Sequence, residues 1–164
     1  MAILPILRYP DPRLRLPCKK VETFDTRLAT LADDLAATMR AAPGIGITAA
    51  HVGVLERLTL IELAGPDSQH VYVNPEIEWF SPDVQRHAEG SVSMPGVTDD
   101  VERPARIRLT YQDLSGNSHT EEADGLLSIC LQHEIDQLGG IFWIDRLSRL
   151  KRERIVKKYN KARD

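Results

Sequence analysis

The segment 125–138, GLLSICLQHEIDQL, constrains the fold of this chain more than any other part of its sequence. On a helix, the apolar side chains of this segment cover nearly every side: Leu126, Leu127, Ile129, Cys130, Leu131, Ile135 and Leu138. A helix that is hydrophobic nearly all round is buried inside a domain. Asp124 is expected to cap its start, and Gly139-Gly140 to end it. We therefore expect the rest of the chain to fold around a central buried helix.

One polar stripe interrupts this apolar helix. His133, Glu134 and Gln137 share a face, because positions three and four apart lie side by side on a helix. Buried polar groups need partners, so the stripe must face a cavity, a ligand or a hydrogen-bonded network. Two histidines one turn apart, with a glutamate after the first, would form a zinc hydrolase motif. Here Gln137 occupies the second histidine position, so half of the helical metal clamp is missing.

Length and composition are those of an ordinary globular protein. The 164 residues are 42% hydrophobic and 27% charged, which predicts a single domain over residues 1–164. No apolar run reaches transmembrane length, and residues 1–15 lack the apolar core of a signal peptide. Two cysteines, Cys18 and Cys130, suit a reducing compartment. We expect a cytoplasmic protein that does not enter a membrane.

The net charge of −3 is unevenly distributed. Residues 145–164 hold nine Lys or Arg against three acids, a local charge of +6, so the rest of the chain carries −9. A basic segment on an acidic body suits a polyanion such as RNA. The plainer interpretation is a solvated helix face.

The remaining elements indicate an α+β fold. Residues 25–42 predict an amphipathic helix that Asp25 or Thr26 caps and Pro43-Gly44 ends. Between residues 54 and 120 the pattern changes to short strands, with side chains alternating over 58–63 and 107–111. Residues 148–163 predict a final, more exposed helix.

Three segments share their order and separations with a known family. They are residues 44–53 (GIGITAAHVG), 89–96 (EGSVSMPG) and 132–138 (QHEIDQL). Together they resemble the three signature motifs of peptide deformylases. The opening residues 7–14 (LRYPDPRL) and the closing 144–147 (IDRL) extend this similarity over nearly the whole chain. The resemblance implies that family's fold: short antiparallel strands packed around a central buried helix, with a C-terminal helix.

The resemblance also implies a reaction. Peptide deformylases are cytoplasmic metallohydrolases that remove the formyl group from N-formylmethionine on nascent chains. Their Fe²⁺ or Zn²⁺ is held by a cysteine of the second motif and two histidines of the third. A glutamate that lies between the two histidines in the sequence moves the proton. A glutamine ending the first motif and a backbone N–H after the cysteine stabilise the oxyanion. The substrate lies as an added strand along the first motif.

Matched residue by residue, this chain differs from the family at three functional positions. His133 and Glu134 match the first histidine and the base. Ser91 stands at the cysteine position, Gln137 at the second histidine position and His51 at the oxyanion glutamine position. The resemblance implies further roles for the Val92 backbone N–H and for a substrate-binding frame of Gly44, Ile45, Gly46, Glu89 and Gly90.

These substitutions predict the loss of the metal and of the reaction. A serine hydroxyl stays protonated near neutral pH, and a glutamine amide is a poorer ligand than imidazole. Structural zinc sites hold their ion with about 10–16 kcal/mol, and much of this depends on the missing ligands. Without a metal, the pKa of the attacking water returns towards about 15.7 from about 7. We therefore expect no cofactor and an absent or severely weakened deformylase activity.

Two catalytic alternatives remain open. Ser91 could act as a nucleophile that His133 or His51 activates, which would make the chain a hydrolase of another kind. His51 could instead bind a metal together with His133 and one of Ser91, Gln137 or Glu89. The favoured interpretation is that these residues fill the former metal site with a neutral hydrogen-bonded network. Cys130 is interpreted as a core residue, and His70, His87 and His119 as surface or satisfied histidines.

Partners follow from the same resemblance. A retained groove predicts binding of N-formylmethionyl or methionyl nascent peptides, and a subunit that modulates a genuine deformylase is an alternative. The C-terminal helix of some bacterial family members docks on the ribosome, so the basic residues 146–163 predict ribosome binding. We expect neither a membrane nor DNA as a partner.

Overall fold

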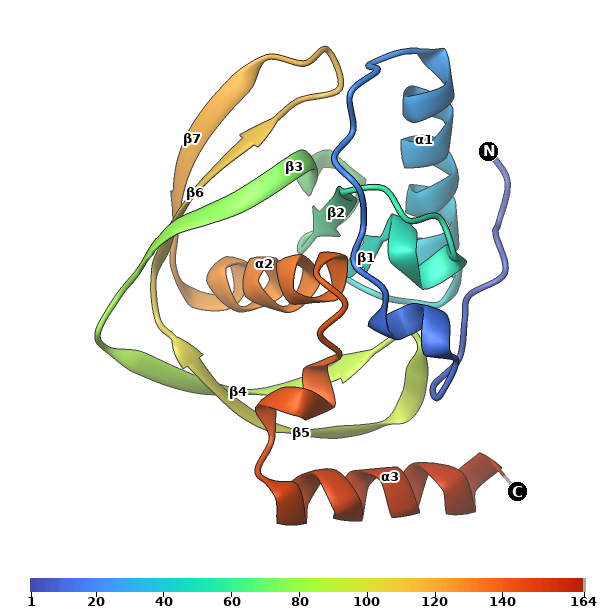
Figure 1. Ribbon diagram of the computed structural model, residues 1–164, viewed down its shortest axis with the longest axis vertical. Helices are drawn as coiled ribbons and strands as arrows, with labels where there is room; N and C mark the ends of the chain where they lie inside the picture. The colour runs from blue at the N-terminus through green and yellow to red at the C-terminus, as the bar shows by residue number, and fades with distance from the viewer. Residues whose placement is uncertain (164) are drawn as a thin grey trace.

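The computed structural model describes residues 1–163, which form an α+β fold with a helix between two antiparallel sheets (Figure 1). The helices are α1 (Thr26–Ala41), α2 (Gly125–Leu138) and α3 (Arg149–Arg163). The strands are β1 (Gly46–Thr48), β2 (Leu58–Glu62), β3 (Gln69–Phe80), β4 (Val84–Ser91), β5 (Met94–Pro104), β6 (Ile107–Gln112) and β7 (Ser118–Ala123). The expected architecture of antiparallel strands around a central helix is confirmed.

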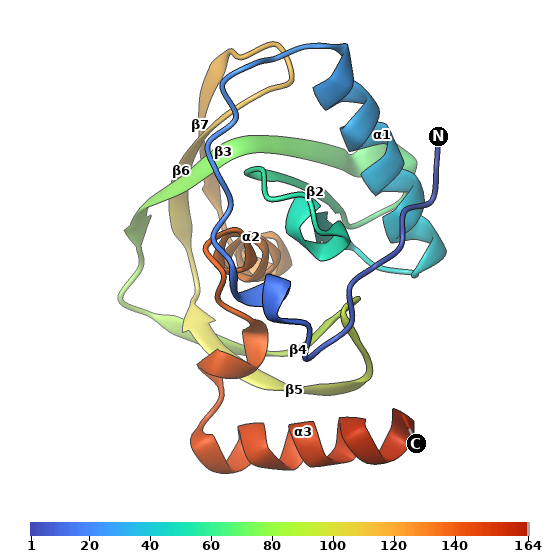
Figure 2. The ribbon, with the colours of Figure 1, turned by 45° about the vertical axis from the view of Figure 1, so that its right-hand side comes forward.

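The strands form one five-stranded sheet and one hairpin. The larger sheet has the order β1-β2-β3-β6-β7, and β4 pairs with β5 alone. Figure 2 shows α2 nearly end-on, with β3, β6 and β7 on one side and β4 and β5 on the other. This places the segment that carries His133 and Glu134 between the two sheets.

The helix α2 begins and ends where the sequence predicts. Asp124 is its N-cap residue, although its carboxylate accepts no capping hydrogen bond, and Gly139 is its C-cap. Leu131 and Leu138 are fully buried, and Leu131 packs with Ile107 and other residues of the larger sheet. The burial is not complete all round, because Leu126 in the first turn is 39% exposed, and Leu127 and Ile135 are only partly buried.

The helix α1 and the strand β2 both form where the sequence predicts them. The predicted cap is confirmed, since Asp25 Oδ1 accepts a hydrogen bond from the Leu28 N–H at 3.1 Å. The strand expected within residues 58–63 is present as β2, and all five of its residues are buried. Because β2 contacts both α1 and α2, neither of its faces reaches solvent. β3 and β5, with 12 and 11 residues, are also longer than the short strands expected.

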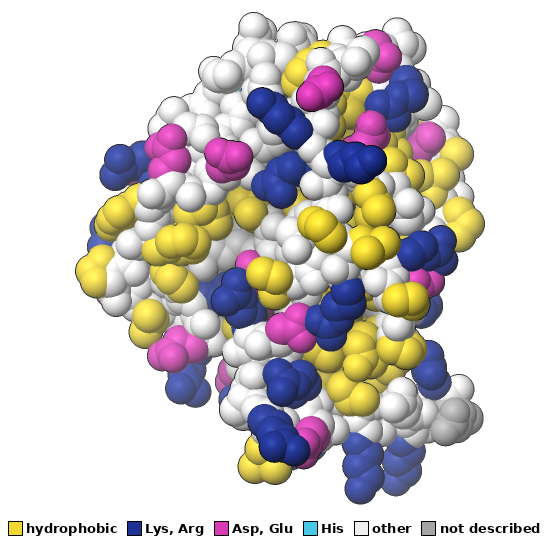
Figure 3. Space-filling model, in the orientation of Figure 1, with side chains coloured by type: hydrophobic (Ala, Val, Ile, Leu, Met, Phe, Trp, Pro, Cys, Tyr) yellow, Lys and Arg dark blue, Asp and Glu magenta, His cyan; other side chains and the backbone are white. Residues whose placement is uncertain are grey.

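The helix α3 packs against the outer side of β5. Its Ile155 and Tyr159 are buried in a cluster with Leu14, Phe142 and Trp143, so the helix is anchored by apolar contacts. Figure 3 shows Lys and Arg side chains projecting from the lower edge of the molecule, where α3 lies. No helix within residues 1–163 has the length and apolarity needed to cross a membrane.

Candidate functional site

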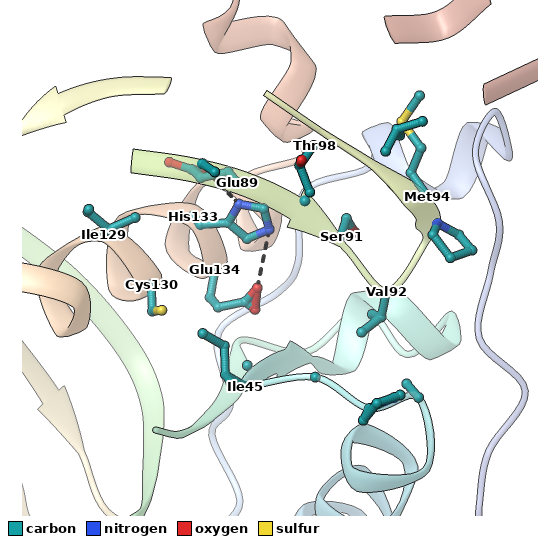
Figure 4. A pocket seen from close by; sticks show the side chains of 18 of the residues that line it. Ile45, Glu89, Ser91, Val92, Met94, Thr98, Ile129, Cys130, His133 and Glu134 are labelled. Carbon is teal, nitrogen blue, oxygen red and sulfur yellow. Dashed lines mark hydrogen bonds and ion pairs between the residues drawn. The ribbon is translucent and has the colours of Figure 1, made fainter. Parts of the chain in front are cut away.

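A cavity of about 410 Å³ opens beside α2, and the three motif segments meet around it. Figure 4 shows His133 and Glu134 of α2 pointing into the same space as Ser91, Val92 and Ile45. The larger apolar side chains of the lining are those of Ile45, Val92, Met94, Val97, Leu126, Ile129 and Cys130. All the site residues singled out in the sequence line this cavity except Gln137.

His133 is oriented by a carboxylate behind it. Its Nδ1 lies 2.8 Å from Glu89 Oε1, and its Nε2 lies 3.6 Å from Glu134 Oε1. Because the Glu89 carboxylate can only accept a hydrogen bond, Nδ1 is the donor. The other ring nitrogen, Nε2, faces Glu134. Burial opposes charging of His133, but the hydrogen bond to Glu89 and the negative charge of Glu134 outweigh it and raise the pKa of His133.

Glu134 is a buried carboxyl group with spare hydrogen-bonding capacity. The residue is 3% exposed, and Oε2 has no hydrogen-bond partner within residues 1–163. Burial raises the pKa of Glu134 to about 7, and the nearby His133 charge opposes this rise. Near neutral pH such a carboxyl group is present in both its protonated and its ionised form.

A chain of ion pairs, which begins at a buried arginine and ends at the surface, lies behind this site. Arg103, which is 4% exposed, donates to both carboxylate oxygens of Glu89 and, at 2.9 Å, to Asp136. Asp136 in turn accepts two hydrogen bonds from Arg146. Burial raises the pKa of Glu89, but hydrogen bonds from His133 and Arg103 prevail and lower it to about 2. Glu89 therefore stays ionised, and its carboxylate holds His133 in place through the hydrogen bond to Nδ1.

The Ser91 hydroxyl accepts a hydrogen bond from the Ser93 N–H at 3.0 Å. Within residues 1–163, neither His51 nor His133 hydrogen-bonds this hydroxyl. A serine nucleophile needs a base within hydrogen-bond reach. The arrangement therefore gives no support to the serine nucleophile considered above.

Gln137 is hydrogen-bonded to the main chain and does not face the cavity. The residue is 2% exposed, and its Nε2 donates to the Leu14 carbonyl oxygen at 2.7 Å. At the three positions where the family has metal ligands, this chain has the His133 imidazole, the Ser91 hydroxyl and the Gln137 amide. The hydroxyl accepts a hydrogen bond from a backbone N–H, and the amide donates one to a backbone carbonyl. Such donors do not fit a tightly held Fe²⁺ or Zn²⁺.

His51 is locked in one tautomer by the turn that carries it. The 3-10 turn Ala49–Val52 has Thr48 as its N-cap, and the Thr48 backbone N–H lies 2.9 Å from His51 Nδ1. A backbone N–H can only donate, so Nδ1 is unprotonated and the ring proton is on Nε2. Burial, followed by the nearby His133 charge, lowers the pKa of His51 to about 3, so the ring is neutral. Nε2 then presents a proton rather than a lone pair, which argues against the rearranged metal site.

Two glycines of the first motif allow close contact with the opposite wall of the cavity. A Cβ atom on Gly46 would lie 3.3 Å from Glu134 Cδ, and one on Gly44 would lie 2.9 Å from Val92 Cγ1. The adjoining strand β1 pairs with β2 alone, so its other edge is open within the described chain. The first motif thus has a strand edge without a partner in the described chain, and its main chain at Gly46 lies close to the Glu134 side chain.

Some residues that line the cavity were not singled out in the sequence. His87 is exposed, as a surface histidine should be, and also lines the cavity, and Cys130 lines it as well as joining the core. Alternate residues of a strand share a face, so His87 could have been found from Glu89 and Ser91. Helical spacing from His133 likewise points to Ile129 and Cys130.

Comparisons with known proteins agree with the motifs. The polypeptide deformylase family matches residues 3–153. A peptide deformylase-like protein of Agrobacterium fabrum is 57% identical over 100% of this chain and 99% of its own length. A peptide deformylase of the same bacterium is 44% identical over 99% and 97%. The crystal structure of a peptide deformylase from Legionella pneumophila has a TM-score of 0.93 at 41% identity, covering 99% of this chain and 96% of its own. The chain belongs to the peptide deformylase family.

Proposed function

We propose that this protein binds N-terminal methionyl peptides, formylated ones included, in the cavity beside α2 and does not hydrolyse them. The observation that carries the proposal is the position of Gln137, whose amide is committed to the Leu14 carbonyl. Turning it towards the cavity would leave a buried carbonyl unpaired, at a cost of about 1–3 kcal/mol. The cytoplasm is the compartment in which such a protein meets nascent chains.

The cavity itself supports peptide binding. Its apolar lining suits an unbranched side chain such as that of methionine, and the open edge of β1 suits an extended peptide backbone. Relatives offer a second argument. Agrobacterium fabrum has both a peptide deformylase and a peptide deformylase-like protein, and this chain is more similar to the latter. A protein that works alongside a genuine deformylase, and does not replace it, would account for the presence of both proteins in one bacterium and for the greater similarity of this chain to the deformylase-like one.

The purified protein is expected to contain far less than one iron, nickel or zinc ion per chain. Hydrolysis of formyl-Met-Ala-Ser should be more than about 10³-fold slower than with a genuine deformylase, since without a metal the pKa of the attacking water stays at about 15.7 instead of about 7. Elemental analysis and the hydrolysis assay on one preparation test both expectations, with the Agrobacterium fabrum deformylase purified in parallel as a positive control. Close to one metal ion per chain after mild chelation, together with turnover, would refute the proposal.

We also propose that the exposed face of α3 binds ribosomal RNA. Arg154, Lys157, Lys158 and Lys161 are exposed, and within residues 1–163 none of them makes an ion pair. Arg146, which the sequence analysis included in the basic segment, instead belongs to the ion-pair chain below the cavity. Because α3 buries Ile155 and Tyr159, charge reversal tests this role better than removal of the helix.

Replacing Arg154, Lys157 and Lys158 with glutamate is expected to abolish co-sedimentation with ribosomes at low salt. Counterion release makes such binding fall steeply with salt, so the wild-type protein should also dissociate as salt rises. The matched control reverses three exposed charges elsewhere: Lys19, Lys20 and Arg86. Equal sedimentation of both triple variants, or none by the wild-type protein, would contradict this role for α3.

A further inference from the structure

A second cavity, of about 450 Å³, lies against the larger sheet on the side away from α2. On β6, Ile107 and Leu109 pack towards α2 in a cluster with Leu131. Alternate residues of a strand point to opposite faces, so Thr110 and Gln112, which line the second cavity, point the other way. The chain before α1 passes beside β3 and the turn between β6 and β7 on this side (Figure 1). Within residues 1–163, the second cavity shares no lining residue with the cavity beside α2.

The wall of the second cavity is held in place by Asn74. Its Oδ1 accepts a hydrogen bond from the Val21 N–H at 2.8 Å, and its Nδ2 donates to the Val21 carbonyl at 2.9 Å and to Gln112 at 2.8 Å. Gln112 in turn donates to the Gly116 carbonyl at 3.1 Å. These amides join the chain before α1 to β3, β6 and the turn after β6. The cavity is therefore preformed, and its amide groups are largely used by the protein itself.

Two cations of the lining have no counter-ion. Arg57 and Lys20 line the cavity, and neither makes an ion pair within residues 1–163. Arg57 is half-buried, and its Nη2 donates to the Pro75 carbonyl at 2.6 Å, which fixes the guanidinium and leaves its other N–H groups available. A charge that is partly removed from water needs a partner of opposite sign. The arginine fork matches a phosphate group, to which it can donate two parallel hydrogen bonds.

The rest of the polar lining suits hydroxyl groups. Thr110, Ser118 and Thr120 line the cavity, and within residues 1–163 their hydroxyls make no hydrogen bond to another side chain or to the main chain. Glu76 also lines it, as an exposed carboxylate. A carboxylate accepts hydrogen bonds from hydroxyl groups but repels a phosphate. A ligand that carries hydroxyl groups beside its phosphate complements both parts of the lining.

We propose that the second cavity binds a small phosphorylated sugar. The phosphate lies at Arg57 and Lys20, and the sugar hydroxyls lie at Glu76 and the threonine hydroxyls. Sugar phosphates and ribonucleotides share this chemistry, since both carry a phosphate on a hydroxylated ring. The site is independent of the peptide binding and the ribosome binding proposed above.

Calorimetric titration of the full chain with ribose 5-phosphate, inorganic phosphate and ribose tests the proposal. Ribose 5-phosphate is expected to bind at least about tenfold more tightly than inorganic phosphate, and ribose should not bind detectably up to about 10 mM. Arg57→Gln should weaken ribose 5-phosphate binding about 10–100-fold, the scale of hydrogen bonds to a charged group. The matched control is Arg86→Gln, an exposed arginine of β4 outside the cavity, which should leave the affinity unchanged.

Glu76→Gln separates the two parts of the site. It should weaken ribose 5-phosphate binding, because the amide is a poorer acceptor for the sugar hydroxyls. Inorganic phosphate should bind the same variant at least as tightly as it binds the wild-type protein, because a repelling charge is removed. Since Glu76 is exposed and makes no ion pair within residues 1–163, this variant keeps the proposal testable even if Arg57→Gln does not fold.

Adenosine 5′-monophosphate distinguishes the two sources of the ligand. Tighter binding than that of ribose 5-phosphate identifies ribonucleotides, weaker binding identifies sugar phosphates, and either result supports the proposal. Absence of saturable binding of both compounds to the folded wild-type protein overturns it. So does equal affinity for ribose 5-phosphate and inorganic phosphate, or equal weakening by Arg57→Gln and Arg86→Gln.

Discussion

Replacing Ser91 with cysteine and Gln137 with histidine is expected to give this protein close to one bound metal ion per chain. The third ligand is already in place, because Glu89 fixes Nδ1 of His133 and leaves Nε2 facing the cavity. Carboxylates behind a ligating histidine orient it in this way in metal sites generally. Formyl-Met-Ala-Ser hydrolysis should then become measurable, since Glu134 lies beside His133 and can move the proton of the attacking water. Elemental analysis and the hydrolysis assay measure the two gains separately.

The control is Ser91→Ala with Gln137→His, which differs only by the thiolate and should bind metal much more weakly. In the active double variant, a further His51→Phe change is expected to lower the rate by about 10²–10³-fold, as loss of one oxyanion donor does in other enzymes. A double variant that folds and binds metal, yet shows no hydrolysis even with His51→Gln added, would mean that the peptide groove has diverged as well.

Arg103→Ala is expected to cause the largest loss of stability among single substitutions at the site. It would leave Glu89 and Asp136 without their shared buried cation, and breaking a buried ion pair typically costs about 3–5 kcal/mol in the free energy of unfolding. For a chain of this length that loss corresponds to a fall in Tm of about 6–20 °C. Thermal and urea unfolding followed by circular dichroism measure it.

Arg27→Ala is the matched control for Arg103→Ala. Arg27 makes a similar two-point contact with Glu56, but its side chain is 57% exposed, so about 0–1 kcal/mol is expected. Equal effects of the two substitutions would contradict a special role for the buried pair.

The helices of this fold could be predicted because their signals are local. The apolar segment 125–138 fixed both the ends and the central position of α2, and Asp25 gave the start of α1. The faces of β2 could not be predicted, because the two helices that cover them are distant in the sequence. Local patterns specify which element forms, whereas burial depends on its neighbours.

The same division holds at the site. His51, Ser91 and His133 lie around one cavity, and the resemblance to the family motifs led us to expect this. The hydrogen bond from Gln137 to Leu14 spans 123 residues of sequence, and no local pattern announces it. Arg103, which supports Glu89, was not singled out, because a lone arginine on a strand gives no sign that it is buried.

The short length of β1 limits how long any peptide can remain on it. Three residues at the edge of the sheet offer few main-chain groups to an added strand, and each hydrogen bond contributes only about 0.5–1.5 kcal/mol net. Weak complexes of this kind differ from tight ones chiefly by faster dissociation. A ribosome adds about 5–20 residues per second to a growing chain. With so short an edge, residence times should be brief, so that one molecule samples many emerging chain ends in succession.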